Sequence, residues 1–302
     1  SMFGFQRTGD LMWAAADAGA RGFLLGGTAG RTTLNGEGLQ HEDGHSHLLA
    51  GAIPNCRAYD PTFSYEIAVV LQDGVRRMLQ EQEDVYYYVT VMNENYEHPD
   101  MPAGVEGDII KGMYLFRDSG SGIRDSGKGK GKSKAPCVQL LGSGTILREV
   151  IAAAELLEKE FGVASDIWSC PSFSELRRDG FDVERWNRLH PMDKKPRKAH
   201  VTACLDGRAG PAVAATDYVR EYADQIRAFM PDGKRYVVLG TDGYGRSDTR
   251  ANLRGFFEVD RYWIAHAAIA ALAADGEMNP EDVARAIKQW KLDPEKPNPL
   301  TV

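Results

Sequence analysis

Residues 41–47, HEDGHSH, are the part of this chain whose residue types and spacing most resemble a reactive centre. The first five residues match the pattern H-E-x-x-H. In a helix, that spacing places two histidines on one face, where they bind zinc, and the glutamate acts as a base. The match carries this chemistry only if the segment is helical.

Glycines argue against a helix at this position. Gly36, Gly38 and Gly44 interrupt the segment, and the residues before His41 show no apolar stripe. Each glycine inside a helix costs about 1 kcal/mol relative to alanine. We therefore interpret the stretch as a polar loop rather than the helix of a zinc protease.

A loop could use these side chains in two ways. It could hold zinc through His41, His45 and His47, or it could form a polar wall of an active site. We expect Asp43 to shape the loop through side-chain-to-backbone hydrogen bonds and assign it no chemistry.

Two further glycine motifs follow predicted strands. Gly142-Ser143-Gly144 resembles the start of the dinucleotide fingerprint G-x-G-x-x-G, but Leu147 occupies the last position. We expect a tight strand-to-helix turn there. Residues 240–245, GTDGYG, are also expected to form a turn.

The elements that must position these residues are predicted from apolar periodicity and from glycine and proline positions. Strands are expected at residues 22–27, 52–61, 84–94, 136–144, 165–170, 198–205 and 235–243. Helices are expected at residues 7–20, 62–82, 145–162, 172–191 with an interruption at Gly180, 216–230, 258–276 and 279–292. Alternating strands and helices indicate an α/β fold with a parallel sheet.

Composition and charge narrow the class of protein. The chain has 302 residues, 43% hydrophobic and 26% charged, which suits a globular protein with two domains. A net charge of -7 argues against a nucleic-acid partner. Four cysteines without C-x-x-C spacing, and no apolar leader at the N-terminus, favour a reducing cytoplasm. The most apolar run, residues 263–274, is too short to cross a membrane and is expected to be a buried helix.

One segment has a composition that buries almost nothing. Residues 118–135 are rich in glycine, serine and lysine. We expect a flexible surface loop, within a chain that divides into domains at residues 1–103 and 104–302.

Long strings of the chain resemble one enzyme family. These strings are residues 3–47, 53–78, 85–102, 138–150, 172–180, 185–191 and 238–260. They are similar to the homodimeric, bacterial type of the pyruvate dehydrogenase decarboxylating component, a thiamine diphosphate enzyme of the transketolase-like group. The resemblance covers nearly the whole chain, which looks like the C-terminal third of such an enzyme.

The resemblance implies a fold and an activity. Residues 1–103 would be part of a parallel-sheet pyrimidine-binding domain, and residues 104–302 a transketolase C-terminal-like α/β domain. The parent enzyme decarboxylates pyruvate oxidatively with thiamine diphosphate and magnesium. It acetylates the lipoyl domain of the dihydrolipoyl acetyltransferase component, and it works as a homodimer in the cytoplasm.

The family's diphosphate and magnesium motif, Gly-Asp-Gly followed by an asparagine pair, does not occur in this chain. The glutamate that activates the aminopyrimidine is absent too. We therefore expect the chain to be inactive alone, and we keep a non-catalytic scaffold or dimerisation module as the alternative. Without the rest of the enzyme, residues 30–47 are expected to lose their packing partners and to be mobile or rearranged.

The resemblance also assigns site residues. His41 would contact the substrate-derived part of the reacting molecule, and Glu37 would lie close to it. His47 aligns with a substrate-side histidine of transketolases, while His45 is a less defined substrate-side residue. Phe3 would pack against the aminopyrimidine ring, and no residue is assigned to a metal.

Overall fold

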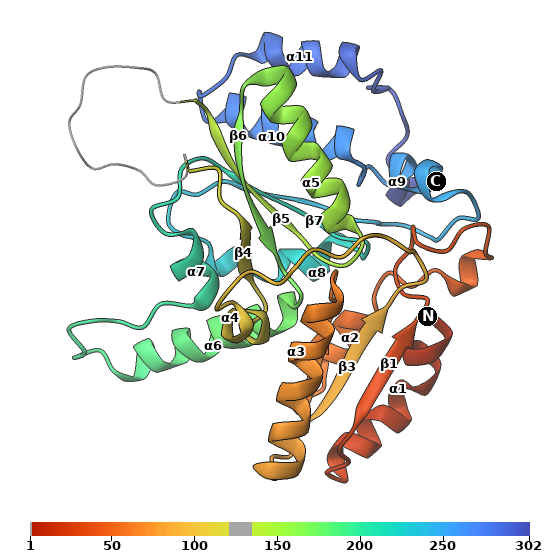
Figure 1. The fold of residues 1–302 in the computed structure, drawn as a ribbon, viewed down its shortest axis with the longest axis vertical. Helices are drawn as coiled ribbons and strands as arrows, with labels where there is room; N and C mark the ends of the chain where they lie inside the picture. The colour runs from red at the N-terminus through yellow and green to blue at the C-terminus, as the bar shows by residue number, and fades with distance from the viewer. Residues whose placement is uncertain (1, 121–134) are drawn as a thin grey trace.

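The structure is a computed structural model that describes residues 2–120 and 135–302, with side chains from residue 4 onward. It contains two sheets, each covered by helices, and the two resulting lobes are stacked one above the other (Figure 1). The predicted glycine- and lysine-rich loop lies largely outside the described residues.

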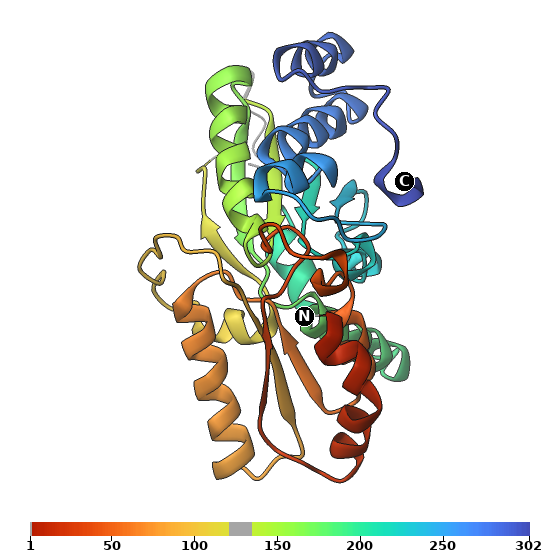
Figure 2. The same ribbon diagram turned by 90° about the vertical axis from the view of Figure 1, so that its right-hand side faces the viewer.

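The first lobe is built on a three-stranded parallel sheet. Its strands, in spatial order, are β1 (Phe23–Gly27), β3 (Tyr86–Val91) and β2 (Cys56–Tyr59). Helices α1 (Met2–Asp17) and α2 (Ser46–Ala52) cover one face of the sheet, and α3 (Ser64–Val75) covers the other (Figure 2).

The central strand β3 shows why both faces need cover. Tyr86 and Tyr88 pack with the helices α1 and α2, whereas Tyr87 and Val89 pack with α3. Successive side chains of a strand point to opposite faces, so an apolar run without alternation is buried on both sides.

The second lobe is built on a five-stranded sheet. Its strands, in spatial order, are β4 (Tyr114–Arg117), β6 (Ala164–Ser169), β5 (Cys137–Gly142), β7 (Ala212–Ala215) and β8 (Tyr236–Leu239). Strand β4 runs antiparallel to β6, and the other pairs are parallel. The predicted parallel α/β fold is confirmed, with an antiparallel strand added at one edge.

Helices cover both faces of the second sheet. On one face lie α5 (Ile146–Leu156), α9 (Arg250–Phe256), α10 (Arg261–Ala274) and α11 (Pro280–Gln289). On the other lie α6 (Phe173–Leu189), α7 (His200–Leu205) and α8 (Arg220–Asp224). The short helix α4 (Glu106–Lys111) contacts α3 of the first lobe and α6 of the second, and so bridges the lobes.

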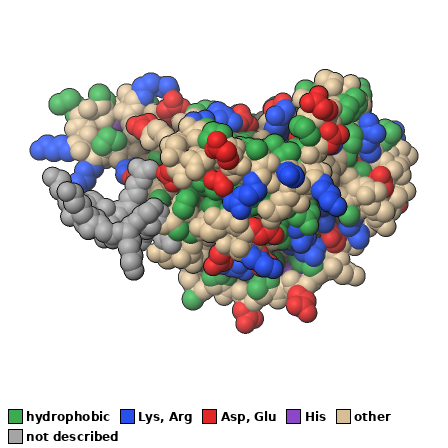
Figure 3. Space-filling model, turned by 90° about the horizontal axis from the view of Figure 1, so that it is seen from above, with side chains coloured by type: hydrophobic (Ala, Val, Ile, Leu, Met, Phe, Trp, Pro, Cys, Tyr) green, Lys and Arg blue, Asp and Glu red, His purple; other side chains and the backbone are tan. Residues whose placement is uncertain are grey.

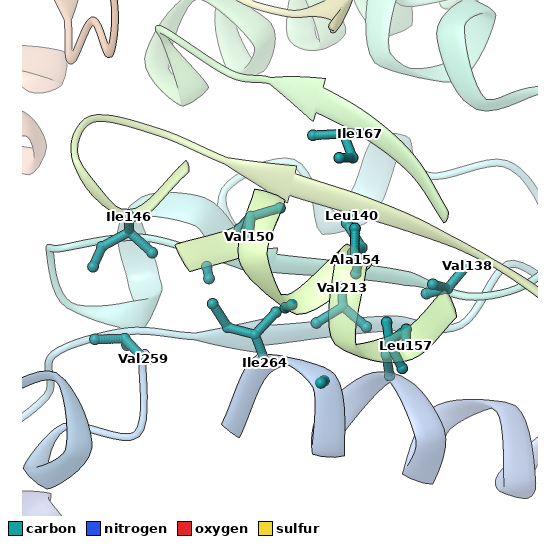
Figure 4. Packing of buried hydrophobic residues seen from close by; sticks show 14 of the residues in the cluster. Val138, Leu140, Ile146, Val150, Ala154, Leu157, Ile167, Val213, Val259 and Ile264 are labelled. Carbon is teal, nitrogen blue, oxygen red and sulfur yellow. The ribbon is translucent and has the colours of Figure 1, made fainter. Parts of the chain in front are cut away.

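The core between the second sheet and helices α5 and α10 is aliphatic. Figure 4 shows Leu140 and Val213 from adjacent strands beside Val150 of α5 and Ile264 of α10. Each is fully buried, which contributes about 1.5–3 kcal/mol per side chain relative to exposure. The apolar run at residues 263–274 is therefore confirmed as a buried helix.

Helix α6 runs without a break through Gly180, so the predicted interruption is wrong. A Cβ at Gly180 would collide with the ring of Phe229, which explains the glycine by close packing. The strand predicted at residues 198–205 is also wrong, because Val201 and Leu205, four residues apart, bury one face of helix α7.

Three elements near the loops also differ from expectation. Helix α2 includes residues 46 and 47, which were expected to be loop, and Ala52, which was expected to begin a strand. Strand β7, made of small residues, was not predicted. The helix expected at residues 216–230 is reduced to α8 and one 3-10 turn, Arg227–Phe229, because residues 216–219 are a loop.

The last helix begins as predicted, with Asn279 in a capping box and a proline at its first position. None of the described helices has the length and apolar character needed to cross a membrane. Acidic and basic side chains are interspersed over the face shown in Figure 3.

Candidate functional site

Three loops meet where the lobes join. They are the His loop (residues 28–45) after β1, the β7–α8 loop (residues 216–219) and the β8–α9 loop (residues 240–249). All three leave the carboxyl ends of parallel strands, the edge at which α/β sheets usually bind ligands. In Figure 2 the His loop rises from the first lobe into the second.

The HEDGHSH stretch is not one helix. His41 ends a single 3-10 turn, Leu39–His41, and Glu42 is extended with φ -85° and ψ 93°. Helix α2 begins only at Ser46. The two histidines of the H-E-x-x-H match therefore do not share a helix face, and the structure does not support a zinc protease site.

A zinc site on the loop also gains no support. Among residues 2–120 and 135–302, no three His, Cys, Asp or Glu side chains are grouped so that they could hold a metal ion. His41 and His45 are half-buried, whereas His47 is fully buried in helix α2.

Asp43 shapes the turn into helix α2. Its Oδ1 accepts hydrogen bonds from the backbone N–H groups of His45 at 3.0 Å and Ser46 at 2.9 Å. These donors have no partner within the helix, so a side-chain acceptor stabilises the helix start. The prediction that Asp43 shapes the loop is confirmed.

His47 lies in an aromatic cage. Its ring stacks on Tyr222 and meets Tyr218 edge-on, each at a centroid distance of 4.7 Å. Its Nε2 lies 3.1 Å from the Thr90 hydroxyl oxygen, and burial lowers the pKa of His47 to about 3. The imidazole is therefore neutral and enclosed, and its predicted contact with substrate stays a prediction.

Glu37 and His41 lie on the outer part of the His loop. Glu37 is exposed and His41 half-buried. Beside them Leu39 lines a hollow of about 410 Å³, whose other wall includes Tyr244 and Arg246 of the β8–α9 loop. The side chain of Phe3 lies outside the described residues, so its predicted contact is also left as a prediction.

A buried arginine ties the His loop to the β8–α9 loop. The Arg31 guanidinium, 5% exposed, donates through Nη1 to the backbone oxygens of Thr241, at 2.5 Å, and Gly243. Gly44 lies against the same guanidinium, where a Cβ would collide with it. Burial lowers the pKa of Arg31, although nearby carboxylates such as Asp43 oppose the effect.

Glu42 also connects the His loop to the β8–α9 loop, but as a hydrogen-bond acceptor rather than a donor. Its Oε2 accepts a hydrogen bond from the Arg246 backbone N–H. The side chain is fully buried, and this burial raises the pKa of Glu42 to about 7. In the zinc pattern, Glu42 would be the general base. In this structure its carboxyl group instead connects the His loop to the β8–α9 loop.

Asp217 of the β7–α8 loop fixes the start of the His loop. Its carboxylate accepts the Thr32 N–H, and its backbone oxygen accepts the Arg31 N–H at 3.2 Å. A Cβ on Gly30, which has φ 84°, would collide with that carboxylate. Burial raises the pKa of Asp217 to about 7.

These contacts correct one expectation. Residues 30–47 do not lose their packing partners in this chain, because residues 217, 219 and 241–250 supply them. These contacts could not be predicted from the charged residues themselves, since Arg31 and Glu42 look like ordinary surface charges in the sequence. The usable signal was Gly245, the glycine after Tyr244, where a Cβ would collide with Glu42.

The turn at Gly142-Ser143-Gly144 is confirmed as a strand-to-helix connection. A residue of the first lobe, Asp60, contacts this turn through hydrogen bonds. Asp60 accepts the Ser143 hydroxyl at 2.9 Å through Oδ2 and the Gly144 N–H at 3.1 Å through its backbone oxygen. Burial raises the pKa of the Asp60 carboxyl to about 7.

Comparison with known proteins identifies the family to which the chain is related. Residues 1–99 match the family described as the pyruvate dehydrogenase E1 component middle domain, and residues 122–260 match the transketolase-like C-terminal domain. All 302 residues align at 67% identity with the pyruvate dehydrogenase E1 component of Cupriavidus necator. The chain belongs to the pyruvate dehydrogenase E1 family.

Other E1 components agree. The proteins of Pseudomonas aeruginosa and Escherichia coli K12 are 61% and 54% identical to this chain, each over 99% of its length. The chain spans about a third of these relatives, 32% in each case.

Solved structures show the same fold at low sequence identity. Transketolase from Campylobacter jejuni superposes with a TM-score of 0.62 at 16% identity, covering 89% of this chain and 34% of that one. A transketolase mutant from Pichia stipitis gives 0.63 at 14% identity, with 92% and 34% covered. The transketolase-like α/β fold expected from the resemblance is thus confirmed.

Proposed function

We propose that this chain forms part of a pyruvate dehydrogenase E1 component, which decarboxylates pyruvate and transfers the acetyl group to a lipoyl group. The observation that carries the proposal is 67% identity to an E1 component over every residue of the chain. Identity of that degree extends through the loops as well as the core, whereas fold alone says little about function.

The cofactor of the parent enzyme would be thiamine diphosphate with magnesium. The described residues of this chain do not fit the metal, because no three His, Cys, Asp or Glu side chains are grouped among them so that they could hold it. The sequence also has no Gly-Asp-Gly motif for the diphosphate. We therefore propose that residues outside this chain hold that group, and that the chain alone is inactive.

The His loop would supply this chain's part of the active site. His41, half-buried at the end of a 3-10 turn, could donate a hydrogen bond to a substrate carboxylate. Glu37, exposed on the same loop, would act beside it. His45 is half-buried and could reach the same space.

Two assigned residues would act less directly. His47 would support the loop from its aromatic cage unless helix α2 moves, because its ring is fully enclosed here. Phe3 would contact the aminopyrimidine ring. We further propose the domain division at residues 103 and 104, a second subunit, a lipoyl-domain partner and a cytoplasmic location.

The test is release of carbon dioxide from pyruvate, measured with thiamine diphosphate and magnesium. The full-length protein that contains this chain should release it, and the isolated chain should not. The same assay with 2-oxobutanoate and 2-oxoglutarate in place of pyruvate would measure the preference for one 2-oxo acid over another. Faster turnover of another 2-oxo acid would contradict the assignment to pyruvate.

A further inference from the structure

Glu42 lies at the contact between the His loop and the β8–α9 loop. Its carboxylate accepts the Arg246 N–H, and the side chain is 0% exposed. A Cβ on Gly245 would lie 2.8 Å from the Glu42 Cβ and 2.7 Å from its Oε2. Only glycine at residue 245 therefore allows the two loops to approach this closely.

Arg31 holds the same pair of loops from the neighbouring position. Its guanidinium lies against Gly44, two residues after Glu42, and donates to the backbone oxygens of Thr241 and Gly243. Hydrogen bonds that involve a charged partner in a water-poor site are stronger than neutral ones. We call this pair of anchors, Arg31 and Glu42 with residues 241–246, the loop clamp.

His41 directly precedes Glu42 in the chain. The regular structure around it is a single turn, in which the His41 N–H donates to the Gly38 oxygen at 2.9 Å. So short a turn does not fix a side chain by itself. Because His41 and Glu42 are consecutive, a displacement of Glu42 from the clamp would also displace the backbone of His41.

We propose that Glu42 is a positioning residue, which fixes His41 for reaction with pyruvate by anchoring the His loop to the β8–α9 loop. This inference rests on the proposed function. It gives the second lobe a task in the reaction, since the anchoring atoms come from the loop after β8.

Three variants of the full-length protein separate positioning from mere stability. Glu42→Ala removes the acceptor, whereas Glu42→Gln keeps an oxygen that can accept the Arg246 N–H. Gly245→Ala pushes the loops apart and leaves the carboxylate in place. The matched control is Glu175→Ala, which removes a partly buried carboxylate on helix α6 that binds Arg57 of strand β2 and does not contact the two loops.

Kinetics with pyruvate provide the first measurement. Glu42→Ala and Gly245→Ala should lower kcat about 10- to 100-fold with little change in KM, the effect of displacing a reacting group by about 1 Å. Glu42→Gln should stay near the wild-type kcat, as should the control. A wild-type kcat in Glu42→Ala would overturn the proposal.

Amide hydrogen exchange in the full-length protein provides the second measurement, which needs no activity. The Arg246 amide should exchange faster in Glu42→Ala than in wild type and remain protected in Glu42→Gln. Unchanged protection in Glu42→Ala would overturn the clamp. If the full-length wild type does not use pyruvate, that result overturns the proposed function and, with it, the role of Glu42 in the reaction. The exchange measurement still tests whether Glu42 holds the two loops together.

Discussion

At the residue scale, the two histidines that stood out in the sequence have different surroundings. His41 is half-buried, whereas His47 is enclosed by tyrosines with its pKa lowered to about 3. Sequence spacing cannot distinguish these environments, because they depend on side chains more than 40 residues away, such as Tyr88 and Tyr222. The resemblance assigned both residues to the substrate side, and of these two side chains only that of His41 is partly exposed in the structure.

The first prediction concerns His41. His41→Ala in the full-length protein should lower kcat with pyruvate by about 100-fold or more, the usual contribution of a proton-transferring side chain. Stability should change little, because the side chain is only half-buried. The exposed neighbour Gln40, changed to alanine, is the control. Equal losses in the two variants would contradict a role for the imidazole.

The second prediction concerns the Asp60 carboxyl, which burial keeps protonated up to a pKa of about 7, against an ordinary value of 3.8. The folded state therefore binds more protons than the unfolded state between about pH 4 and 7, so this group's contribution to stability falls as pH rises. Asp60→Asn removes the effect.

Urea unfolding of the isolated chain at pH 5 and pH 8 tests this prediction. The stability of Asp60→Asn relative to wild type should rise by about 2–4 kcal/mol between these pH values, since each pKa unit corresponds to about 1.4 kcal/mol. Asp10→Asn is the control, because Asp10 is exposed on helix α1 of the first lobe. If the difference in free energy of unfolding between Asp60→Asn and wild type does not change with pH, the raised pKa of Asp60 is contradicted.

At the element scale, long apolar segments could be predicted as helices or strands from the sequence, whereas short segments of small residues could not. The helix at α10 and the strand at β3 follow from continuous apolar runs. Strand β7, with sequence Ala-Val-Ala-Ala, has no such signal, and its place in the sheet is set by the neighbours β5 and β8. Tertiary packing likewise decided that residues 198–205 are not a strand.

The third prediction follows from the glycine in helix α6. Gly180→Ala should destabilise the chain by about 1–3 kcal/mol, because overpacking against Phe229 outweighs the gain in helix propensity. Gly9→Ala in helix α1, where nothing lies within 4 Å, should stabilise it by up to about 1 kcal/mol. Chemical denaturation measures both, and a stabilised Gly180→Ala would show that Phe229 moves freely.

At the scale of the whole molecule, the two lobes are joined by buried polar contacts as well as by packing. Asp60 binds Ser143, Arg31 binds the loop after β8, and Glu66 of α3 binds the hydroxyls of Tyr114 and Ser169. Such a network is costly to break, since each buried group would lose its partner. We therefore expect the lobes to unfold as one unit, and the His loop to keep its place in a longer protein.

We have proposed that this chain forms part of an enzyme that transfers the acetyl group derived from pyruvate to a lipoyl group. Mass spectrometry of a lipoyl domain, incubated with the full-length protein, thiamine diphosphate, magnesium and pyruvate, tests it most directly. We predict acetylation of the lipoyl group that depends on pyruvate and is strongly reduced by His41→Ala. A lipoyl domain that stays unmodified, with a correctly folded full-length protein, would contradict the account.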